Sequence, residues 1–386
     1  TEFNPKGKKV AVIGNGASGI QVVANLQPVV SQLDHYARNK TWIAASWAGE
    51  ERKLEPQPYT EEEKKKWAED PDAYLAFRKD LEGIYWRRFG TFFRNSELNN
   101  ELREQFINIM KKRLVKKPEL LEHIVPDFSP NCRRLTPGPG YLEAITEDNV
   151  EYIQTRIKRF TETGIETEDG VQRDVDAVIC ATGANVDMVP PFPIKAHGQK
   201  LSDLWKADGV YGFPYTYFGL ATPGFPNLLF VHGPQATGPS GTVPHSVETQ
   251  LTYFAKLLRK ASREGIKSIT PSSKAADDFT EFSDAFFAKT VLTDKCSSWY
   301  NGGRPGARIH GLWPGSAGHI TAIRREPRWE DWEYKYLGDS KNRFAWYLGN
   351  GWTRKETDPE ADLTPYLKRP DEIDLRDVHE SWWSIP

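Results

Sequence analysis

A glycine-rich loop near the N-terminus has the residue types and the spacing that bind the phosphates of a nucleotide. Residues 14–19 read GNGASG, after an apolar β-branched run at residues 8–13 and before apolar residues at helical spacing. In this context the first glycine makes the tight turn, the second lets the backbone approach a pyrophosphate, and the third lets the helix pack on the strand. The pyrophosphate would lie on the N–H groups of the helix N-terminus. The predicted phosphate-binding residues are Gly14, Gly16, Ser18 and Gly19.

The second predicted strand ends in cations rather than in an acid. Residues 33–36 are expected to form this strand, and Arg38 and Lys40 follow it. An acidic residue at this place binds the ribose 2′-hydroxyl of NAD, whereas an arginine accommodates the 2′-phosphate of NADP. Arg38 and Lys40 therefore favour NADP over NAD. The alternative is that they are two exposed loop cations without a ligand.

The elements that must position this loop indicate an α/β fold. The strands at residues 8–13 and 33–36, with the helix between them, form the opening βαβ unit of a Rossmann-like dinucleotide domain. Residues 59–117 are charged, aromatic and helical in period, so a helical insertion is expected at about residues 50–120. After residue 293 we expect a covering layer of irregular structure. Further strands are predicted at residues 152–157, 164–167, 175–180 and 228–232, and a helix at residues 245–262.

Length and composition allow two domains and exclude several classes of function. The 386 residues leave room for about two domains of roughly 150 residues each. Lys and Arg total 51 and Asp and Glu total 53, and this net charge of −2 gives no reason to expect nucleic acid or an anionic membrane as partner. Aromatic residues make up 12% of the chain, which predicts a folded protein with large side chains to bury. No apolar run is long enough to predict a membrane span.

The cysteines and histidines predict neither a disulfide framework nor a metal site. The three cysteines lie far apart in the sequence, and the eight histidines lack the paired spacing of metal ligands. The first nine residues are polar and basic, without the apolar stretch of a secretory signal. A reducing, cytoplasmic location is therefore expected.

Six segments of the chain carry a resemblance to a known family. They read GKKVAVIGNGASGIQVV, HYARNKTW, CRRLTPGPGYLEAITEDNV, DAVICATG, NLLFVHGPQATGP and CSSWYNGGRPG. In this order they resemble the Baeyer–Villiger and related class B flavin monooxygenases, in particular those of fungal secondary metabolism. The resemblance implies a nicotinamide domain inserted within a discontinuous FAD domain. We therefore expect a nicotinamide-type domain at residues 1–225, and the remaining C-terminal half of an FAD-type domain with a covering segment at residues 226–386.

The resemblance also implies roles for individual residues. It puts Arg133 beside Arg38 at the 2′-phosphate. It puts Arg134 at the position of the arginine that stabilises a peroxyflavin beside the nicotinamide, and Trp299 at a tryptophan of the cofactor-facing loop. The family usually has a proline where His245 stands. The alternative for Arg133 and Arg134 is a pair of surface loop charges.

One departure from the family decides the functional prediction. A complete member begins with its own FAD-binding βαβ unit and a histidine-containing fingerprint, whereas this sequence starts at Thr1, directly before the strand at residues 8–13, and contains one GxGxxG. A chain without the flavin's phosphate site predicts a flavin-free cyclase or isomerase, for instance of the Diels–Alder type. Its substrate would be a hydrophobic polycyclic intermediate of secondary metabolism. Holding such a substrate in a reactive shape requires no cofactor.

Four side chains are expected to act as hydrogen-bond donors and walls in this cyclase: Arg134, His245, Trp299 and Tyr300. On this prediction no cofactor is required and NADP binding remains open. The expected partner is a small hydrophobic substrate, with no nucleic acid or membrane, and the oligomeric state is left open. The first alternative is an FAD- and NADPH-dependent Baeyer–Villiger monooxygenase fragment or half-enzyme. The second is a non-catalytic binding protein. Flavin absorption by the purified protein would distinguish the first alternative from the other two readings.

Overall fold

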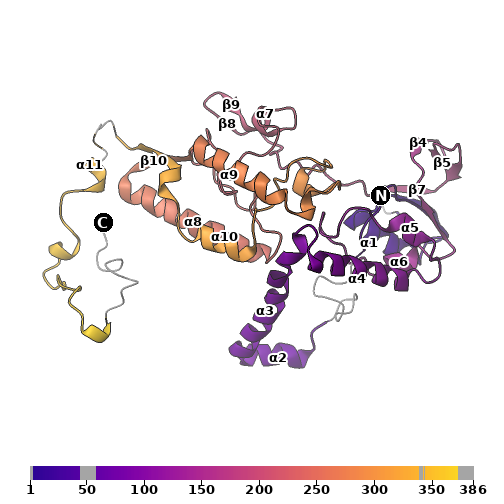
Figure 1. Ribbon diagram of the computed structural model, residues 1–386, viewed down its shortest axis with the longest axis horizontal. Helices are drawn as coiled ribbons and strands as arrows, with labels where there is room; N and C mark the ends of the chain where they lie inside the picture. The colour runs from indigo at the N-terminus through magenta and orange to yellow at the C-terminus, as the bar shows by residue number, and fades with distance from the viewer. Residues whose placement is uncertain (1–2, 44–57, 339–341, 343, 373–386) are drawn as a thin grey trace.

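The computed structural model describes residues 3–43, 58–338, 342 and 344–372. Figure 1 shows an elongated molecule in which two bodies follow one another along the long axis. The N-terminal part of the chain, from indigo to magenta, forms the body at the right of this view. The orange part forms the body in the centre, and the yellow C-terminal residues lie at the left.

A four-stranded parallel sheet forms the centre of the first body, with the strand order β3–β2–β1–β7. Its strands are β1 (Lys9–Ile13), β2 (Gln32–Tyr36), β3 (Val150–Ile153) and β7 (Ala177–Cys180). The central strand β1 pairs on both edges, and its side chains Val10 and Val12 are fully buried. Helix α1 (Ala17–Leu26) follows the glycine loop and adds Ile20 and Val23 to the same core. The predicted α/β fold with its opening βαβ unit is confirmed.

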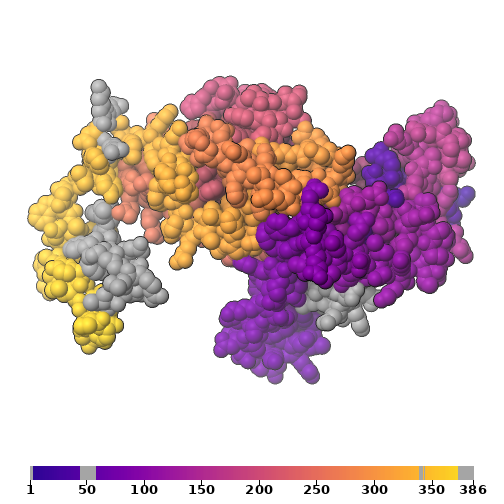
Figure 2. Space-filling view, in the orientation of Figure 1, coloured from indigo at the N-terminus to yellow at the C-terminus, as the bar shows by residue number. Residues whose placement is uncertain are grey.

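The predicted helical insertion lies between β2 and β3, and α2 and α3 project from the lower edge of the molecule (Figure 2). The helices between β2 and β3 are α2 (Glu61–Glu69), α3 (Pro71–Trp86), the 3-10 helix η1 (Arg87–Phe92), α4 (Glu97–Arg113), α5 (Leu120–Ile124) and α6 (Tyr141–Ala144). The last two extend beyond the predicted end near residue 120. Polar side chains cap the first two of these helices: Thr60 and Glu63 form a capping box at α2, and Asp70 accepts two N–H groups of α3. Residues 44–57, which the predicted insertion includes in part, lie outside the described residues.

Two predicted strands differ from the observed ones. The predicted strand at residues 152–157 is divided, because β3 ends at Ile153 and β4 (Ile157–Phe160) belongs to an antiparallel sheet of its own. The other strands of that sheet are β5 (Gly164–Thr167) and β6 (Gln172–Asp174). The predicted strand at residues 228–232 is wrong, since only a single bridge joins Ala221 and Leu229. This apolar run packs its side chains against the second core instead of extending a sheet.

A second hydrophobic core forms around helix α8 (Val243–Glu264), which ends at Gly265 with a left-handed φ of 62°. Residues 201–225 share this core with residues 253–332, and the predicted domain boundary near residue 225 stays a prediction. The remaining elements are β8 (Lys195–Ala196), β9 (Gln199–Lys200), α7 (Leu201–Trp205), β10 (Ile266–Pro271), α9 (Ser273–Phe287), η2 (Val291–Thr293), η3 (Trp299–Asn301), α10 (Ala317–Arg324), η4 (Trp329–Asp331), β11 (Trp332–Tyr336), α11 (Phe344–Tyr347), η5 (Lys355–Thr357) and η6 (Pro370–Glu372).

The stretch after residue 293 is more regular than predicted. Helix α10 is formed there, and β11 pairs with β10 in an antiparallel ladder. The expectation of irregular covering structure is therefore wrong for these two elements. The reason is a long-range partner that a local reading does not contain, since Trp332 of β11 lies opposite Pro271 and is buried in the second core.

Two of the three cysteines are joined, contrary to the sequence expectation. Cys132 and Cys296 form a disulfide with their Cα atoms 6.3 Å apart, although 164 residues separate them in the sequence. In the chain-entropy model, closing a loop of this length stabilises the fold by about 5 kcal/mol. Cys180 is free and exposed. The predicted reducing compartment rested on unpaired cysteines, so it stays a prediction without that support.

Two further findings concern only the described residues. No helix in them is long and apolar enough to cross a membrane. Nor does any group of three or more His, Cys, Asp and Glu side chains in these residues lie close enough together to hold a metal ion.

Two histidines are buried in a neutral state. His35 in β2 is fully buried, its Nε2 lies 2.9 Å from the hydroxyl oxygen of Tyr141, and burial lowers its pKa from 6.5 to about 4. His310 is 2% exposed, and burial likewise lowers its pKa to about 4. Because the folded pKa lies below the unfolded one, folding favours the neutral ring. This stability is fully present above pH 6.5 and is lost as the pH falls from 6.5 towards 4.

Lowering the pH from 6.5 to about 4 should reduce the free energy of unfolding by about 3 kcal/mol for each buried histidine. Urea unfolding of the wild type between pH 7 and pH 4 measures the loss. His35→Gln, which cannot take up a proton, should remove roughly half of the loss that both histidines cause. An identical pH profile for the variant and the wild type would show that His35 is not held neutral by the fold.

Candidate functional site

The glycine loop is held in a conformation that only glycine allows at two positions. Gly14 has a φ of +107°, and a Cβ atom there would lie 2.4 Å from the carbonyl oxygen of Ala181. A Cβ atom at Gly19 would lie 1.9 Å from the carbonyl oxygen of Gly14. The N–H of Gly14 donates a hydrogen bond of 3.0 Å to the carbonyl of Tyr36. The ends of β1, β2 and β7 and the start of α1 are therefore packed backbone to backbone around this turn.

The start of α1 remains open to a ligand. Gly16 is the N-cap of this ten-residue helix, and no side chain caps it. A Cβ atom at Gly16 would meet nothing within 4 Å, in contrast to Gly14 and Gly19. The first turn of a helix carries N–H groups without helical partners and the positive end of the helix dipole. This end of α1 therefore has the geometry and the charge to bind a phosphate.

A cavity of about 640 Å³ lies in front of this helix end. Its walls come from the loops that follow the four parallel strands and from three other segments, which supply Arg133, Glu168 and Ser297. Carboxyl ends of parallel strands are the usual place of a ligand in an open α/β sheet, and this volume suits a cofactor-sized ligand. The polar side chains and glycines that line it are Gly14, Asn15, Gly16, Tyr36, Arg38, Asn39, Arg133, Thr155, Arg156, Glu168, Thr182, Gly183 and Ser297.

The structure brings two predicted phosphate-binding arginines to this one cavity. Arg38 lies exposed just after β2. Arg133 reaches the cavity from the loop after α5, where its guanidinium donates a hydrogen bond to the hydroxyl of Thr41 and lies 5.7 Å from the ring centre of Phe128. Burial lowers the pKa of Arg133, although a guanidinium stays charged at neutral pH. These two guanidinium groups thus face one cavity that also contains a helix N-terminus, and its lining includes a third arginine, Arg156, and the carboxylate of Glu168.

The other predicted cofactor residues have different positions. Gly19 packs the helix on the strand rather than lining the cavity. Ser18 lies exposed in the first turn of α1, outside the cavity lining. Lys40 lines a neighbouring cavity of about 720 Å³, together with Arg94 and Asp294. Of the two cations predicted after the second strand, Arg38 therefore lines the cavity in front of α1 and Lys40 does not.

Sequence reasoning missed several residues of the cavity wall. Thr155 and Arg156 follow β3, the outer neighbour of β2, so the same strand-end rule that selected Arg38 could have found them. Asn15, within the glycine motif, donates a hydrogen bond from its side chain to the carbonyl of Asn39 and joins the two loops. Ser297 comes from a distant segment, and no local signal predicts its position.

Three of the four predicted catalytic side chains lie together beside the disulfide. Tyr300 is buried next to Cys296, and its ring centre lies 4.5 Å from that of Trp299. Burial raises the pKa of Tyr300 to about 12, while the positive charge of Arg134 acts in the opposite direction. Arg134 itself is exposed. The geometry therefore forms a corner of one cation and two aromatic rings.

His245 does not belong to this corner. It lies in the first turn of α8, where its Nε2 is 2.7 Å from the hydroxyl of Thr321 and its ring centre is 5.2 Å from that of Trp86. A separate aromatic cavity of about 320 Å³ in the second body is lined by Phe218, Phe279 and Trp313 among others, and by none of the four predicted catalytic residues. The predicted set of four is thus divided between two places.

Relatives of the chain are known, although no family model matches it. The FAD-binding monooxygenase moxY of Dothistroma septosporum is 33% identical over 381 residues, which cover 97% of this chain and 58% of that protein. The FAD-binding monooxygenase tazF of Aspergillus terreus is 32% identical, over 95% of this chain and 65% of its own length. The chain thus spans about three fifths of the length of these relatives.

Solved structures share the fold. The structure of cyclohexanone monooxygenase from Rhodococcus sp. Phi1 bound to NADP+ matches with a TM-score of 0.69 and 24% sequence identity. The match covers 86% of this chain and 68% of that one. The closed structure of cyclohexanone monooxygenase matches with a TM-score of 0.68.

These relatives overturn the prediction of a flavin-free cyclase. Proteins that are 32–34% identical over more than nine tenths of the chain are named FAD-binding monooxygenases. The expected Diels–Alder-type chemistry and the expected independence from cofactors are therefore wrong. That prediction relied on where the sequence starts. The residues that are present preserve an open phosphate cradle with two arginines, and they bring only part of the predicted cyclase site together.

Gly16 offers a variant that separates ligand binding from folding. A side chain at this position meets no atom, and the φ of −72° suits any residue. Gly16→Ala should change the unfolding free energy by no more than about 1 kcal/mol. The added methyl group would occupy the approach of a phosphate to the helix end, so the affinity for NADP+ should fall roughly tenfold or more. Calorimetric titration and urea unfolding measure the two effects.

Gly14→Ala is the matched control for Gly16→Ala. Its Cβ atom would lie 2.4 Å from a backbone oxygen, so stability and binding should be lost together. Unchanged NADP+ affinity in a folded Gly16→Ala protein would mean that the ligand does not approach this helix end.

Proposed function

Because the chain belongs to the family of FAD-binding, Baeyer–Villiger-type monooxygenases, we propose that it binds NADPH within an FAD- and NADPH-dependent enzyme that converts a ketone to an ester. The balanced reaction consumes ketone, O₂, NADPH and a proton, and it yields ester, water and NADP+. One oxygen atom enters the bond between the carbonyl carbon and a neighbouring carbon, and the other leaves as water. FAD supplies the reaction with O₂.

The observation that carries this proposal is the cavity in front of α1. The open helix end at Gly16 would bind the pyrophosphate through backbone N–H groups. Arg38 and Arg133 would bind the 2′-phosphate from two sides. A phosphate between two guanidinium groups receives charge-assisted hydrogen bonds, which are about twice as strong as neutral ones. The cavity therefore suits NADPH better than NADH.

FAD does not find a comparable cradle among the described residues. A flavin dinucleotide needs a pyrophosphate site of its own, and within residues 3–43, 58–338 and 344–372 the strand, glycine loop and helix arrangement occurs once. The proposal assigns that single loop to the nicotinamide dinucleotide. The flavin's phosphate site would then be supplied by residues outside the described part, either from a longer chain or from a partner.

Arg134 would act on the substrate side in this proposal. It follows Arg133 directly, its charge acts on the buried hydroxyl of Tyr300, and Trp299 packs against that tyrosine. A guanidinium stays charged at any working pH and offers forked donors that can hold an oxygen atom. We assign Arg134 to the stabilisation of negative charge on an oxygen during turnover, and Arg133 to nucleotide binding.

The nucleotide preference tests the first half of the proposal. The protein should bind NADP+ more tightly than NAD+, and Arg38→Ala and Arg133→Ala should each weaken NADP+ binding by about 1.5–3 kcal/mol with little effect on NAD+. Calorimetric titration of both nucleotides gives these values. Arg134→Ala, the neighbour of Arg133 in the same loop, is the control that should keep the preference. Equal affinity of the wild type for both nucleotides would show that the arginines do not face the ribose.

Material from the natural source tests the second half, because it retains any segment or partner that completes the flavin site. Such material should carry FAD, visible as flavin absorption bands, and should form an ester from a cyclic or open-chain ketone with NADPH and O₂. Product analysis by mass spectrometry, with ¹⁸O₂ as the oxygen source, should place one labelled atom in the ester. Flavin-free material that remains fully active would contradict the proposal.

A further inference from the structure

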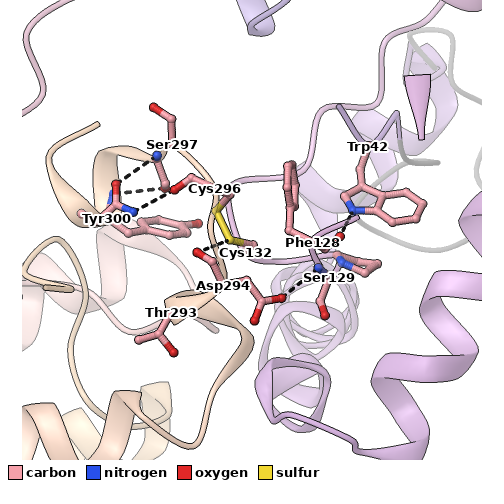
Figure 3. Close-up of a disulfide and its surroundings, with 12 residues drawn as sticks. Trp42, Phe128, Ser129, Cys132, Thr293, Asp294, Cys296, Ser297 and Tyr300 are labelled. Atoms are coloured by element: carbon pink, nitrogen blue, oxygen red, sulfur yellow. Dashed lines mark hydrogen bonds between the residues drawn. A yellow bond between two sulfur atoms is a disulfide. The ribbon is translucent and has the colours of Figure 1, made fainter. Parts of the chain in front are cut away.

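The Cys132–Cys296 disulfide joins two segments that lie on different bodies of the molecule. Both half-cystines are buried, with exposed fractions of 0% and 2%. Cys132 belongs to the loop after α5, and Cys296 to the segment before η3. Figure 3 shows the sulfur–sulfur bond between the violet ribbon of the first body and the pale orange ribbon of the second. The bond is thus a covalent connection across the junction, independent of the chain that passes between the bodies.

Each half-cystine is followed directly by a residue of the nucleotide cavity. Arg133 follows Cys132 and Ser297 follows Cys296, and both side chains line the cavity in front of α1. The first body supplies the wall that contains Arg133, and the second body supplies the wall that contains Ser297. Because the disulfide lies one residue before Arg133 and one residue before Ser297, it limits how far these two walls can separate.

The contacts next to the bond include polar, partly exposed ones beside a buried apolar cluster, in which Phe92 of the first body packs with Phe287 and Leu292 of the second. The N–H of Ser129 donates to the carboxylate of Asp294 over 2.9 Å, and Arg94 forms an ion pair with the same carboxylate over 3.0 Å. The side chain of Arg94 is 42% exposed. Exposed ion pairs contribute little to stability and are weakened by salt. The disulfide is therefore the covalent contact between the loop of Arg133 and the second body, and it adds to this apolar packing.

Arg133 makes its other contacts on its own side of the junction. Thr41 accepts its hydrogen bond, and the ring of Phe128 lies below its guanidinium, while Phe128 in turn accepts a hydrogen bond of 3.0 Å from Trp42 through its carbonyl. None of these partners comes from the second body. Without the disulfide, the loop would keep these contacts, and noncovalent contacts alone would hold it at its distance from Ser297.

We propose that the Cys132–Cys296 disulfide is a positioning pair that sets the preference of this cavity for a 2′-phosphorylated nucleotide, by holding Arg133 against the wall formed by Ser297. The inference rests on the proposed binding of NADPH. Forming the bond removes two electrons and two protons from the two thiols. A glutathione-type disulfide accepts them and becomes two thiols, so the exchange is balanced. Reduction by a dithiol reverses it.

The test uses the full chain as wild type, as Cys132→Ser/Cys296→Ser, and as Cys180→Ser. Cys180→Ser is the matched control, because it removes the free, exposed cysteine and keeps the bond. NADP+ and NAD+ are titrated calorimetrically into each protein before and after treatment with dithiothreitol. Thermal unfolding is followed in parallel, and thiols are counted in the denatured, unreduced proteins.

The bonded wild type and Cys180→Ser should prefer NADP+. Breaking the bond, by substitution or by dithiothreitol, should lower the NADP+ affinity about tenfold, the size of one charge-assisted contact, and the NAD+ affinity by much less. Dithiothreitol should not change the double variant. A disulfide that only stabilises the fold would lower the melting temperature and weaken both nucleotides equally, and it would not change their ratio.

Three outcomes would overturn the inference. The first is an unchanged NADP+ to NAD+ affinity ratio in the folded double variant and in reduced wild type. The second is an equal loss of affinity for both nucleotides. The third is a count of three free thiols in the denatured wild type, where the bond predicts one. Absence of nucleotide binding by the bonded wild type would instead overturn the proposed function, and the inference with it.

Discussion

The backbone of Gly14 passes so close to the carbonyl of Ala181 that no side chain fits between them, and the architecture of the nucleotide cavity depends on this approach. The contact brings the end of β7 against the turn between β1 and α1. Gly19 repeats the constraint one turn later, where its Cα packs on the carbonyl of Gly14. The close backbone contacts fall at these two glycines, whereas a Cβ atom at Gly16, between them, would meet no atom within 4 Å. The result is a helix end whose N–H groups face the cavity rather than a neighbouring side chain.

Residues of both bodies line the nucleotide cavity. The parallel sheet supplies the helix end and Arg38, and the loop after α5 supplies Arg133. Ser297 comes from the second body, next to the corner of Arg134, Trp299 and Tyr300. A nucleotide in the cavity would therefore contact both bodies, and the proposed reaction would proceed where they meet. The disulfide lies at this junction, next to both the cavity and the corner.

Local patterns predicted the first body well. The apolar strand, the glycine loop and the helix of β1 and α1 are encoded within some twenty consecutive residues, and Arg38 follows from the strand-end rule. Features that depend on distant partners were not predictable. The pairing of Cys132 with Cys296 spans 164 residues, and Ser297 follows Cys296 directly. The separation of His245 from Arg134 arises from the packing of α8 on α10, which no motif encodes. The functional prediction was wrong because it relied on where the sequence starts rather than on the residues that the sequence contains.

A crystal structure of the protein with NADP+ tests the central claim most directly, since the claim concerns where one ligand lies. The account predicts the pyrophosphate at the N-terminus of α1, within hydrogen-bond distance of the backbone N–H groups that follow Gly16, and the 2′-phosphate between Arg38 and Arg133. Ser297 should lie at the opposite wall. A nucleotide bound in another cavity, or bound here with its 2′-phosphate directed away from both arginines, would contradict the account.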